Sequence, residues 1–123
     1  MPDPRHLLGL RAEDATAAWL TRRGWTILGR RWRCPEGEID IVAIDADAVL
    51  VAVEVKLRST GRSGDSLDSV DRRRLRRLRA ALGRFRASPE CTTHDGLRID
   101  LVAVRRADGD LWRLSHHPAI EAW

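Results

Sequence analysis

The chain has 123 residues, 43% of them hydrophobic and 33% charged, which fits one folded domain over residues 1–123 and excludes a disordered chain. No apolar run approaches the ~20 residues that span a bilayer, and the N-terminus lacks a signal-peptide pattern, so we expect a cytoplasmic protein with no membrane partner. The net charge of +4 and the pI of about 10.3 favour a polyanionic partner, foremost nucleic acid.

Helical and strand patterns alternate along the chain. Apolar residues recur at helical spacing over about 7–23, and a second, arginine-rich helix is expected over about 67–87. Strands are expected at 25–33, 38–45, 49–58, 97–105 and 111–115, and the tail 116–123 can add a short helix. The order is helix, three strands, helix, two strands. It predicts an α/β fold with a central mixed β-sheet flanked by helices, in which the second helix connects two parallel strands.

The second and third strands predict a hairpin that brings acidic residues and a lysine together. With residues 46–48 as the turn, Asp40 lies directly opposite Glu54. The same register places Glu38 opposite Lys56. Opposed side chains project from the same face, with Cβ atoms roughly 4.5–5.5 Å apart. A slip of one residue would move Asp40 to the other face, so the inference depends on this register.

Two opposed carboxylates destabilise a sheet unless something compensates their charge. A divalent cation does so, and carboxylate oxygens suit Mg²⁺ or Mn²⁺. Lys56 is the only lysine among 22 basic residues, and an ammonium beside a metal can position or deprotonate an attacking water. Asp40, Glu54 and Lys56 therefore predict a catalytic site for phosphodiester hydrolysis. The alternative is a solvated hairpin face, but the apolar neighbours of Asp40 and Glu54 favour a buried site.

Several motifs together resemble a known family. GEIDIVAID and VAVEVKLRS resemble the Asp…Glu-x-Lys signature of the PD-(D/E)XK, restriction-endonuclease-like nucleases. With RRGWTILGRRWR, SVDRRRLRRLRAAL and LRIDLVAV in this order, the chain is similar to the small YraN-like family of uncharacterised bacterial proteins in that superfamily. The resemblance implies a restriction-endonuclease-like core. It also implies nuclease chemistry but no particular substrate, and our first hypothesis is a Mg²⁺-dependent endonuclease or exonuclease acting on DNA, with structured or branched DNA included.

The resemblance also implies roles for individual residues. Asp40 and Glu54 match the metal ligands, which bind Mg²⁺ or Mn²⁺, and the backbone carbonyl of Val55 is an extra ligand. Lys56 matches the catalytic lysine. Glu13 in the first helix matches a catalytic glutamate that often completes such sites.

Arginines are the candidates for nucleic-acid binding. Arg73, Arg74 and Arg77 belong to a run in the second helix that either grips phosphates or is a solvated helix face. Arg74 stands where related sequences often carry lysine, so a role there depends on its charge and not on proton transfer. Arg62 lies in a loop of Ser and Gly that either contacts the substrate or is a linker.

Other functions and residues remain open. A non-catalytic nucleic-acid-binding module or a protein-interaction module could retain the same fold. A monomer of this size covers little duplex, so a homodimer is one way to reach both strands. Asp100 either neighbours the site or pairs with an arginine, and the segment His116–Pro118 is expected to form a turn without metal ligands. The two cysteines have no metal-binding or disulfide spacing.

Overall fold

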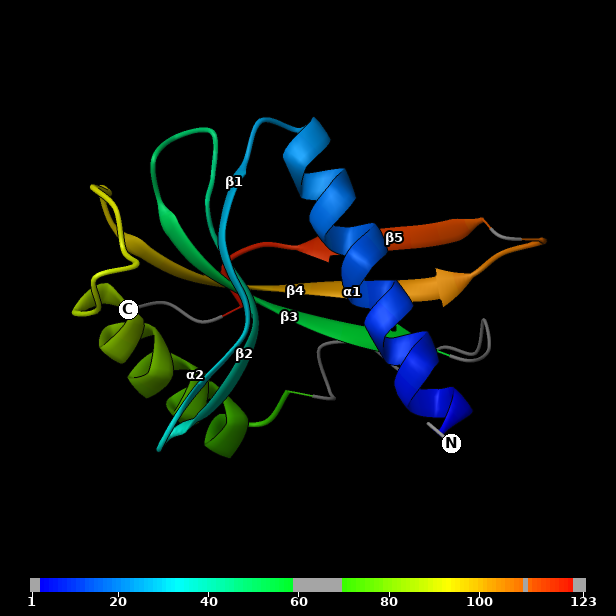
Figure 1. Cartoon of the computed structure of the whole chain (residues 1–123), viewed down its shortest axis with the longest axis horizontal. Coiled ribbons are helices and arrows are strands. Elements are labelled where there is room, and N and C mark those ends of the chain that lie inside the picture. Colours follow the sequence, from blue (N-terminus) through cyan, green and yellow to red (C-terminus); the bar gives the residue numbers. More distant parts are fainter. Residues whose placement is uncertain (1–2, 59–69, 110, 121–123) are drawn as a thin grey trace.

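The computed structural model describes residues 3–58, 70–109 and 111–120. It shows a five-stranded sheet with one helix on each face (Figure 1). The strands lie in the order β1-β2-β3-β4-β5. The elements are α1 (Pro4–Arg22), β1 (Thr26–Cys34), β2 (Gly37–Ile44), β3 (Leu50–Arg58), α2 (Arg72–Arg86), β4 (Leu97–Arg106) and β5 (Trp112–His117). No helix within the described residues is long and apolar enough to cross a bilayer.

The sheet is mixed, as the element order predicts. Strands β3 and β4 pair in parallel through the crossover helix α2, while the other neighbouring strands are antiparallel. The order αβββαββ and the mixed sheet are those of a restriction-endonuclease-like core, so the predicted fold class is confirmed.

Aspartate caps decide where both helices begin. Asp3 caps α1 and Pro4 takes the first helical position, so α1 begins earlier than the expected residue 7. Asp71 accepts the backbone N–H of Arg74 at 2.8 Å, so α2 begins after this cap and not at the expected residue 67. Residues 67–69 lie outside the described part of the chain.

The C-terminal segment differs from two expectations. His116 and His117 belong to β5 and not to a turn, because they pair with β4 opposite Val102 and Leu101. Residues 118–120 are not helical, and the rest of the expected tail helix lies outside the described residues.

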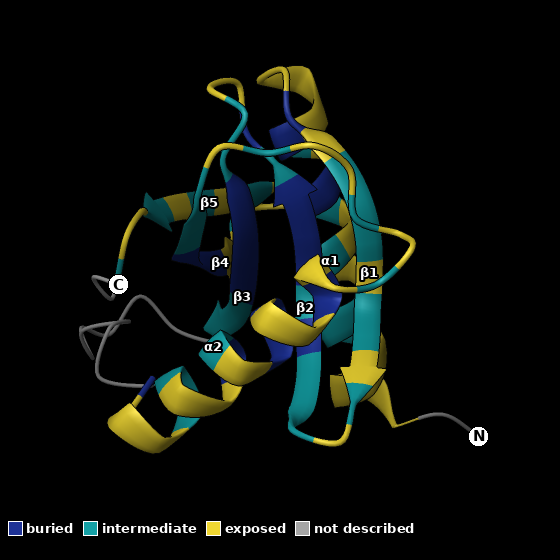
Figure 2. Ribbon diagram, turned by 90° about the vertical axis from the view of Figure 1, so that its left-hand side faces the viewer, coloured by how far each residue is buried: buried dark blue, intermediate teal, exposed yellow. Residues whose placement is uncertain are grey.

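Each face of the sheet buries its own apolar cluster under one helix. Side chains two apart on a strand share a face, so alternate residues of β3 and β4 supply the two clusters. The cluster between α2 and the sheet contains Leu50, Ala52, Leu78, Leu82, Phe85, Ile99 and Leu101. The cluster between α1 and the sheet contains Ala12, Leu20, Val51, Val53, Val102 and Val104. Figure 2 shows β2, β3 and β4 buried between the helices, with β1 and β5 more exposed.

The turn between β2 and β3 fixes the predicted register near it. Asp45 Oδ1 accepts the N–H groups of Asp47 and Val49, both at 2.9 Å, and Ala48 has a φ of 68°. The backbone pairs are Ile44 with Leu50, Ala43 with Val51, Val42 with Ala52 and Ile41 with Val53. This part of the predicted register is confirmed.

Strand β2 changes face at Asp40. Ile39 packs in the cluster under α2, whereas Ile41 packs under α1, although residues two apart in a regular strand share a face. Across from Asp40 on β1, Arg31 has a φ of 51°. The register of β2 and β3 still sets Glu54 opposite Asp40, but the backbone ladder ends one pair earlier, at Ile41 and Val53, and does not include Asp40. Its Oδ2 instead accepts the backbone N–H of Val55 at 2.8 Å, so a side chain joins the two strands where their ladder ends.

Candidate functional site

A pocket of about 250 Å³ lies where the ladder between β2 and β3 ends. Its lining comes from four elements that are distant in the sequence. The lining residues are Gly9, Ala12, Glu13, Asp40, Glu54, Val55, Lys56, Leu57 and Arg74. Because α1 and α2 cover opposite faces of the sheet, the opening between the strands lets both helices contribute. The structure thus brings together every residue that the sequence assigned to catalysis or to metal binding.

Asp40 and Glu54 lie together in the pocket and are joined through their side chains. Burial, and next the charge of Glu54, raises the pKa of Asp40 to about 8. Burial acts on Glu54 as well, but hydrogen bonds from Arg74 and Asp40 lower the pKa of Glu54 below its ordinary value. At neutral pH the pair therefore carries one proton, held by Asp40, and one negative charge, held by Glu54. This proton removes the like-charge repulsion that two opposed carboxylates would suffer.

Two cations face the Glu54 carboxylate, which is only 2% exposed. The Nε and Nη2 atoms of Arg74 donate to Oε2 and Oε1 at 2.7 and 2.9 Å. Nη2 also donates to the backbone carbonyl of Glu38 at 3.0 Å. The Nζ of Lys56 lies 3.6 Å from Glu54 Oε2. The sequence missed this bidentate pairing of Arg74, which it placed on the outer helix face.

Glu13 brings a buried oxygen without a hydrogen bond into the pocket from α1. Its Oε1 has no hydrogen-bond partner within the described residues, and the Nη2 of Arg30 lies 4.0 Å away. Burial raises the pKa of Glu13, while Arg31 and Arg30 oppose this shift. A buried oxygen that lacks a partner is costly, so this atom suits a ligand that enters the pocket.

The chemistry of this donor set fits a hard divalent cation. Carboxylate and carbonyl oxygens, completed by water, are the ligands that Mg²⁺ and Mn²⁺ prefer, and the pocket offers them from Glu13, Asp40, Glu54 and Val55. Within the part of the chain that the structure describes, no three acidic, His or Cys groups converge as a preformed metal site. Arg74 holds both oxygens of Glu54 in this state.

The arginines expected to bind nucleic acid lie in different places. Arg73 and Arg77 line, together with Arg76, a hollow of about 540 Å³ between the outer face of α2 and the β1–β2 turn. We call this hollow the arginine groove. All three side chains are exposed to solvent. Arg74 points inward to the pocket, and Arg62 lies outside the described residues.

Glu38 does not face Lys56 as the hairpin register predicted. It pairs with Arg33 of β1 in the backbone ladder, and its carboxylate lies 3.5 Å from the side chains of both Arg31 and Arg33. The reason is that the ladder between β2 and β3 has already ended at Ile41, so β1 alone sets the direction of this end of β2.

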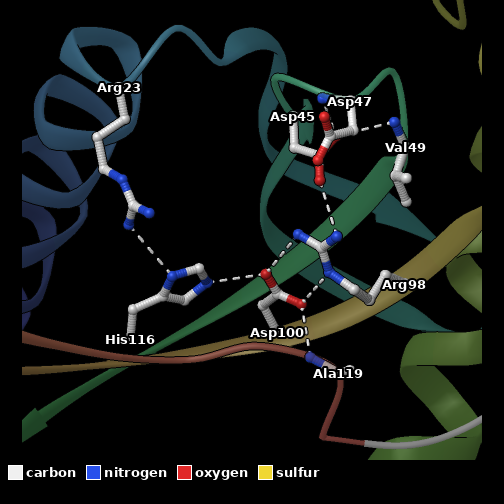
Figure 3. Close-up of polar contacts among 8 residues, drawn as sticks. All are labelled: Arg23, Asp45, Asp47, Val49, Arg98, Asp100, His116 and Ala119. Atoms are coloured by element: carbon white, nitrogen blue, oxygen red, sulfur yellow. Dashed lines mark hydrogen bonds and ion pairs between the residues drawn. The ribbon is translucent and has the colours of Figure 1, made fainter.

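Asp100 belongs to a separate network and does not line the pocket (Figure 3). Its fully buried carboxylate accepts two hydrogen bonds from Arg98, at 2.8 and 3.0 Å, one from His116 Nε2 at 2.8 Å and one from the Ala119 N–H at 2.9 Å. Burial alone would raise the pKa of Asp100, but these hydrogen bonds lower it. Arg98 also reaches Asp45 at 2.7 Å, so the network ties the β2–β3 turn to β4 and β5.

Comparison with known proteins identifies relatives across most of the chain. The model of the uncharacterised protein family UPF0102 matches residues 12–104, a range that contains every lining residue of the pocket except Gly9. A UPF0102 protein of Beutenbergia cavernae is 38% identical over 109 residues, which cover 89% of this chain and 91% of the relative. One of Methylococcus capsulatus is 44% identical over 100 residues, covering 81% and 79%.

A more distant UPF0102 protein, of Chloroflexus aurantiacus, is 34% identical over 116 residues, covering 94% of this chain and 93% of the relative. These matches agree with the resemblance to the YraN-like family. The chain therefore belongs to the uncharacterised protein family UPF0102.

Proposed function

We propose that the pocket is the active site of a Mg²⁺-dependent nuclease that hydrolyses phosphodiester bonds in DNA, with Mn²⁺ as an alternative cation. The observation that carries this proposal is the convergence of Glu13, Asp40, Glu54 and Lys56 on one partly enclosed pocket. A solvated hairpin face would leave its charged side chains in water, whereas Glu54 is almost fully buried beside a second carboxyl group.

We assign some pocket residues to binding the cation and Lys56 to orienting the attacking water and stabilising the phosphate. Asp40 and Glu54 would hold the cation, with the carbonyl of Val55 and the orphaned oxygen of Glu13 as further ligands. When bound, Mg²⁺ lowers the pKa of a coordinated water and polarises the phosphate. The Lys56 ammonium orients the attacking water and stabilises the negative charge that develops on the phosphate oxygens. The water oxygen bonds to phosphorus as the bond to the leaving sugar oxygen breaks, and a proton passes to that oxygen.

The arginine groove is the part of the surface that we assign to the substrate backbone. Arg73, Arg76 and Arg77 present three exposed guanidinium groups there, and guanidinium groups pair well with phosphates. Arg74 lies between the groove and the pocket, because its Nη1 lies beside Gly37 of the groove while its Nε and Nη2 reach Glu54 in the pocket. A DNA strand leaving the pocket would therefore meet the groove.

The two free cysteines are consistent with a protein that acts in the reducing cytoplasm.

A cleavage assay tests the proposal. Purified protein is incubated with duplex, single-stranded and branched DNA and with RNA, in Mg²⁺, in Mn²⁺ and in EDTA. We expect metal-dependent cleavage of at least one DNA substrate, and a loss of roughly a hundredfold or more in Glu54→Gln. Salt-dependent binding without cleavage of any substrate would instead identify a non-catalytic nucleic-acid-binding module. Absence of both binding and cleavage would favour a protein-interaction module.

A further inference from the structure

The guanidinium of Arg74 donates hydrogen bonds to both oxygens of Glu54, a carboxylate that the proposed metal centre requires. Its Nε and Nη2 contact Glu54 Oε2 and Oε1 at 2.7 and 2.9 Å in a bidentate arrangement. The Glu54 side chain is only 2% exposed, and the Arg74 side chain is 28% exposed. A cation that binds Glu54 through either oxygen therefore meets an acceptor that is already engaged and a positive charge within contact distance.

This arrangement supplies the buried Glu54 carboxylate with a positive charge from within the chain. Burial of a carboxylate is costly unless a hydrogen-bonded cation accompanies it, and Arg74 donates to both Glu54 oxygens. A guanidinium keeps its charge at every physiological pH. Arg74 thus supplies the compensating charge that the sequence pattern led us to expect from a metal.

We infer that Arg74 competes with a divalent cation for Glu54 and yields this carboxylate when the cation binds. This inference rests on the proposed function of the pocket as a metal centre. Arg74 is then a positioning residue, because it holds the Glu54 carboxylate in place until the metal binds.

The surroundings of Arg74 allow its head group to move while its backbone stays fixed. The cap of α2 holds the backbone, since Asp71 accepts the Arg74 N–H at 2.8 Å. The guanidinium has another acceptor outside the carboxylate pair, the carbonyl of Glu38 at 3.0 Å from Nη2. A small rotation about the side-chain bonds of Arg74 can keep the hydrogen bond to the Glu38 carbonyl and break the two hydrogen bonds to Glu54. The released guanidinium would remain between the pocket and the arginine groove, where a phosphate group would meet it.

The Nε–H resonances of arginine side chains detect this exchange directly. Mg²⁺ is titrated into the wild-type protein, and the Arg74 resonance is assigned by its absence in Arg74→Lys. We expect this resonance to shift as Mg²⁺ binds. The Nε–H of Arg98, which donates to Asp100 at 2.8 Å outside the pocket, is the internal control and should not move. If calorimetry records Mg²⁺ binding while the Arg74 resonance stays in place, the inference is wrong and the metal centre stands.

Calorimetry of two matched variants gives an independent measurement. Arg74→Met removes the charge and keeps the apolar stem, whereas Arg86→Met removes the same charge at the far, exposed end of α2. We expect Arg74→Met to bind Mg²⁺ on the order of tenfold more tightly than wild type at the same pH. Arg86→Met should match wild type.

The outcomes distinguish a failure of the inference about Arg74 from a failure of the proposed metal centre. Binding by Arg74→Met that equals or falls below that of wild type contradicts the competition. If neither wild type nor Arg74→Met binds Mg²⁺ or Mn²⁺, the metal centre fails, and the proposed function fails with it.

Discussion

The backbone N–H of Val55 donates to Oδ2 of Asp40 at 2.8 Å, just beyond the last backbone pair of β2 and β3. This bond replaces a link of the ladder and holds the Asp40 side chain between the strands. In that position the carboxyl group is buried beside Glu54, and both effects raise its pKa to about 8. The end of the ladder therefore creates both the pocket and the unusual acid within it.

Asp40→Asn should stabilise the protein, and by more as the pH rises towards 8. The folded protein keeps the Asp40 proton up to a pKa of about 8, whereas the unfolded chain loses it near the ordinary value of 3.8. Folding stability in wild type therefore falls as the pH rises through this window, with a slope that approaches ~1.4 kcal/mol per pH unit. Asparagine cannot ionise and still accepts the Val55 N–H. Urea unfolding between about pH 5 and pH 8 measures the difference, and a gap that is independent of pH would contradict the raised pKa.

Lys56→Met should abolish most cleavage and leave the fold and metal binding intact. The Lys56 side chain is 33% exposed and its Nζ lies 3.6 Å from Glu54 Oε2, so the ammonium can act on a water or a phosphate in the pocket without being part of the core. We expect kcat to fall by about two orders of magnitude or more, with the Mg²⁺ affinity from calorimetry changed much less. Lys56→Arg keeps the charge but is not equivalent, and it should also be strongly impaired. Full activity in Lys56→Met would remove Lys56 from the site.

The double variant Arg73→Ala/Arg77→Ala should weaken DNA binding and its dependence on salt. Each phosphate contact contributes about 0.9 to the slope of log K against log salt on duplex DNA, so removing two contacts should lower the slope by about 2. Arg22→Ala/Arg113→Ala removes the same charge from exposed positions on α1 and β5. Fluorescence anisotropy at several salt concentrations compares the two variants. Equal slopes for both would mean that the arginine groove is an ordinary solvated surface.

Asp100→Ala should destabilise the protein by ~3–5 kcal/mol, because it removes the buried acceptor shared by Arg98, His116 and the Ala119 N–H. The comparison is urea unfolding at constant pH. Asp14→Ala is a control, since its carboxylate is exposed and pairs with Arg30 at the surface, where an ion pair is worth little. Similar small losses for both variants would show that the network in Figure 3 contributes little to folding.

The sequence predicts the elements and most of the hairpin because these depend on local patterns. A short turn capped by Asp45 sets the register, and four backbone pairs follow it. The end of the ladder could not be predicted. Ile39 and Ile41 are both apolar, so the pattern does not reveal that they pack on opposite faces.

A signal for the inward direction of Arg74 does exist in the sequence. Arg74 stands four residues before Leu78 and eight before Leu82, which places it on the buried stripe of α2 with Phe85. An arginine on such a stripe needs an acidic partner. That this partner is Glu54, twenty residues earlier on another element, depends on tertiary packing and not on spacing in the sequence.

The central claim is that a divalent cation binds between the carboxylates of this pocket. Crystals soaked in Mn²⁺ and measured at the manganese absorption edge test it most directly. We expect an anomalous peak in contact with Asp40 and Glu54, with the Arg74 guanidinium no longer bound to Glu54. A pocket without a peak at saturating Mn²⁺, with Arg74 still bound to both oxygens of Glu54, would contradict it.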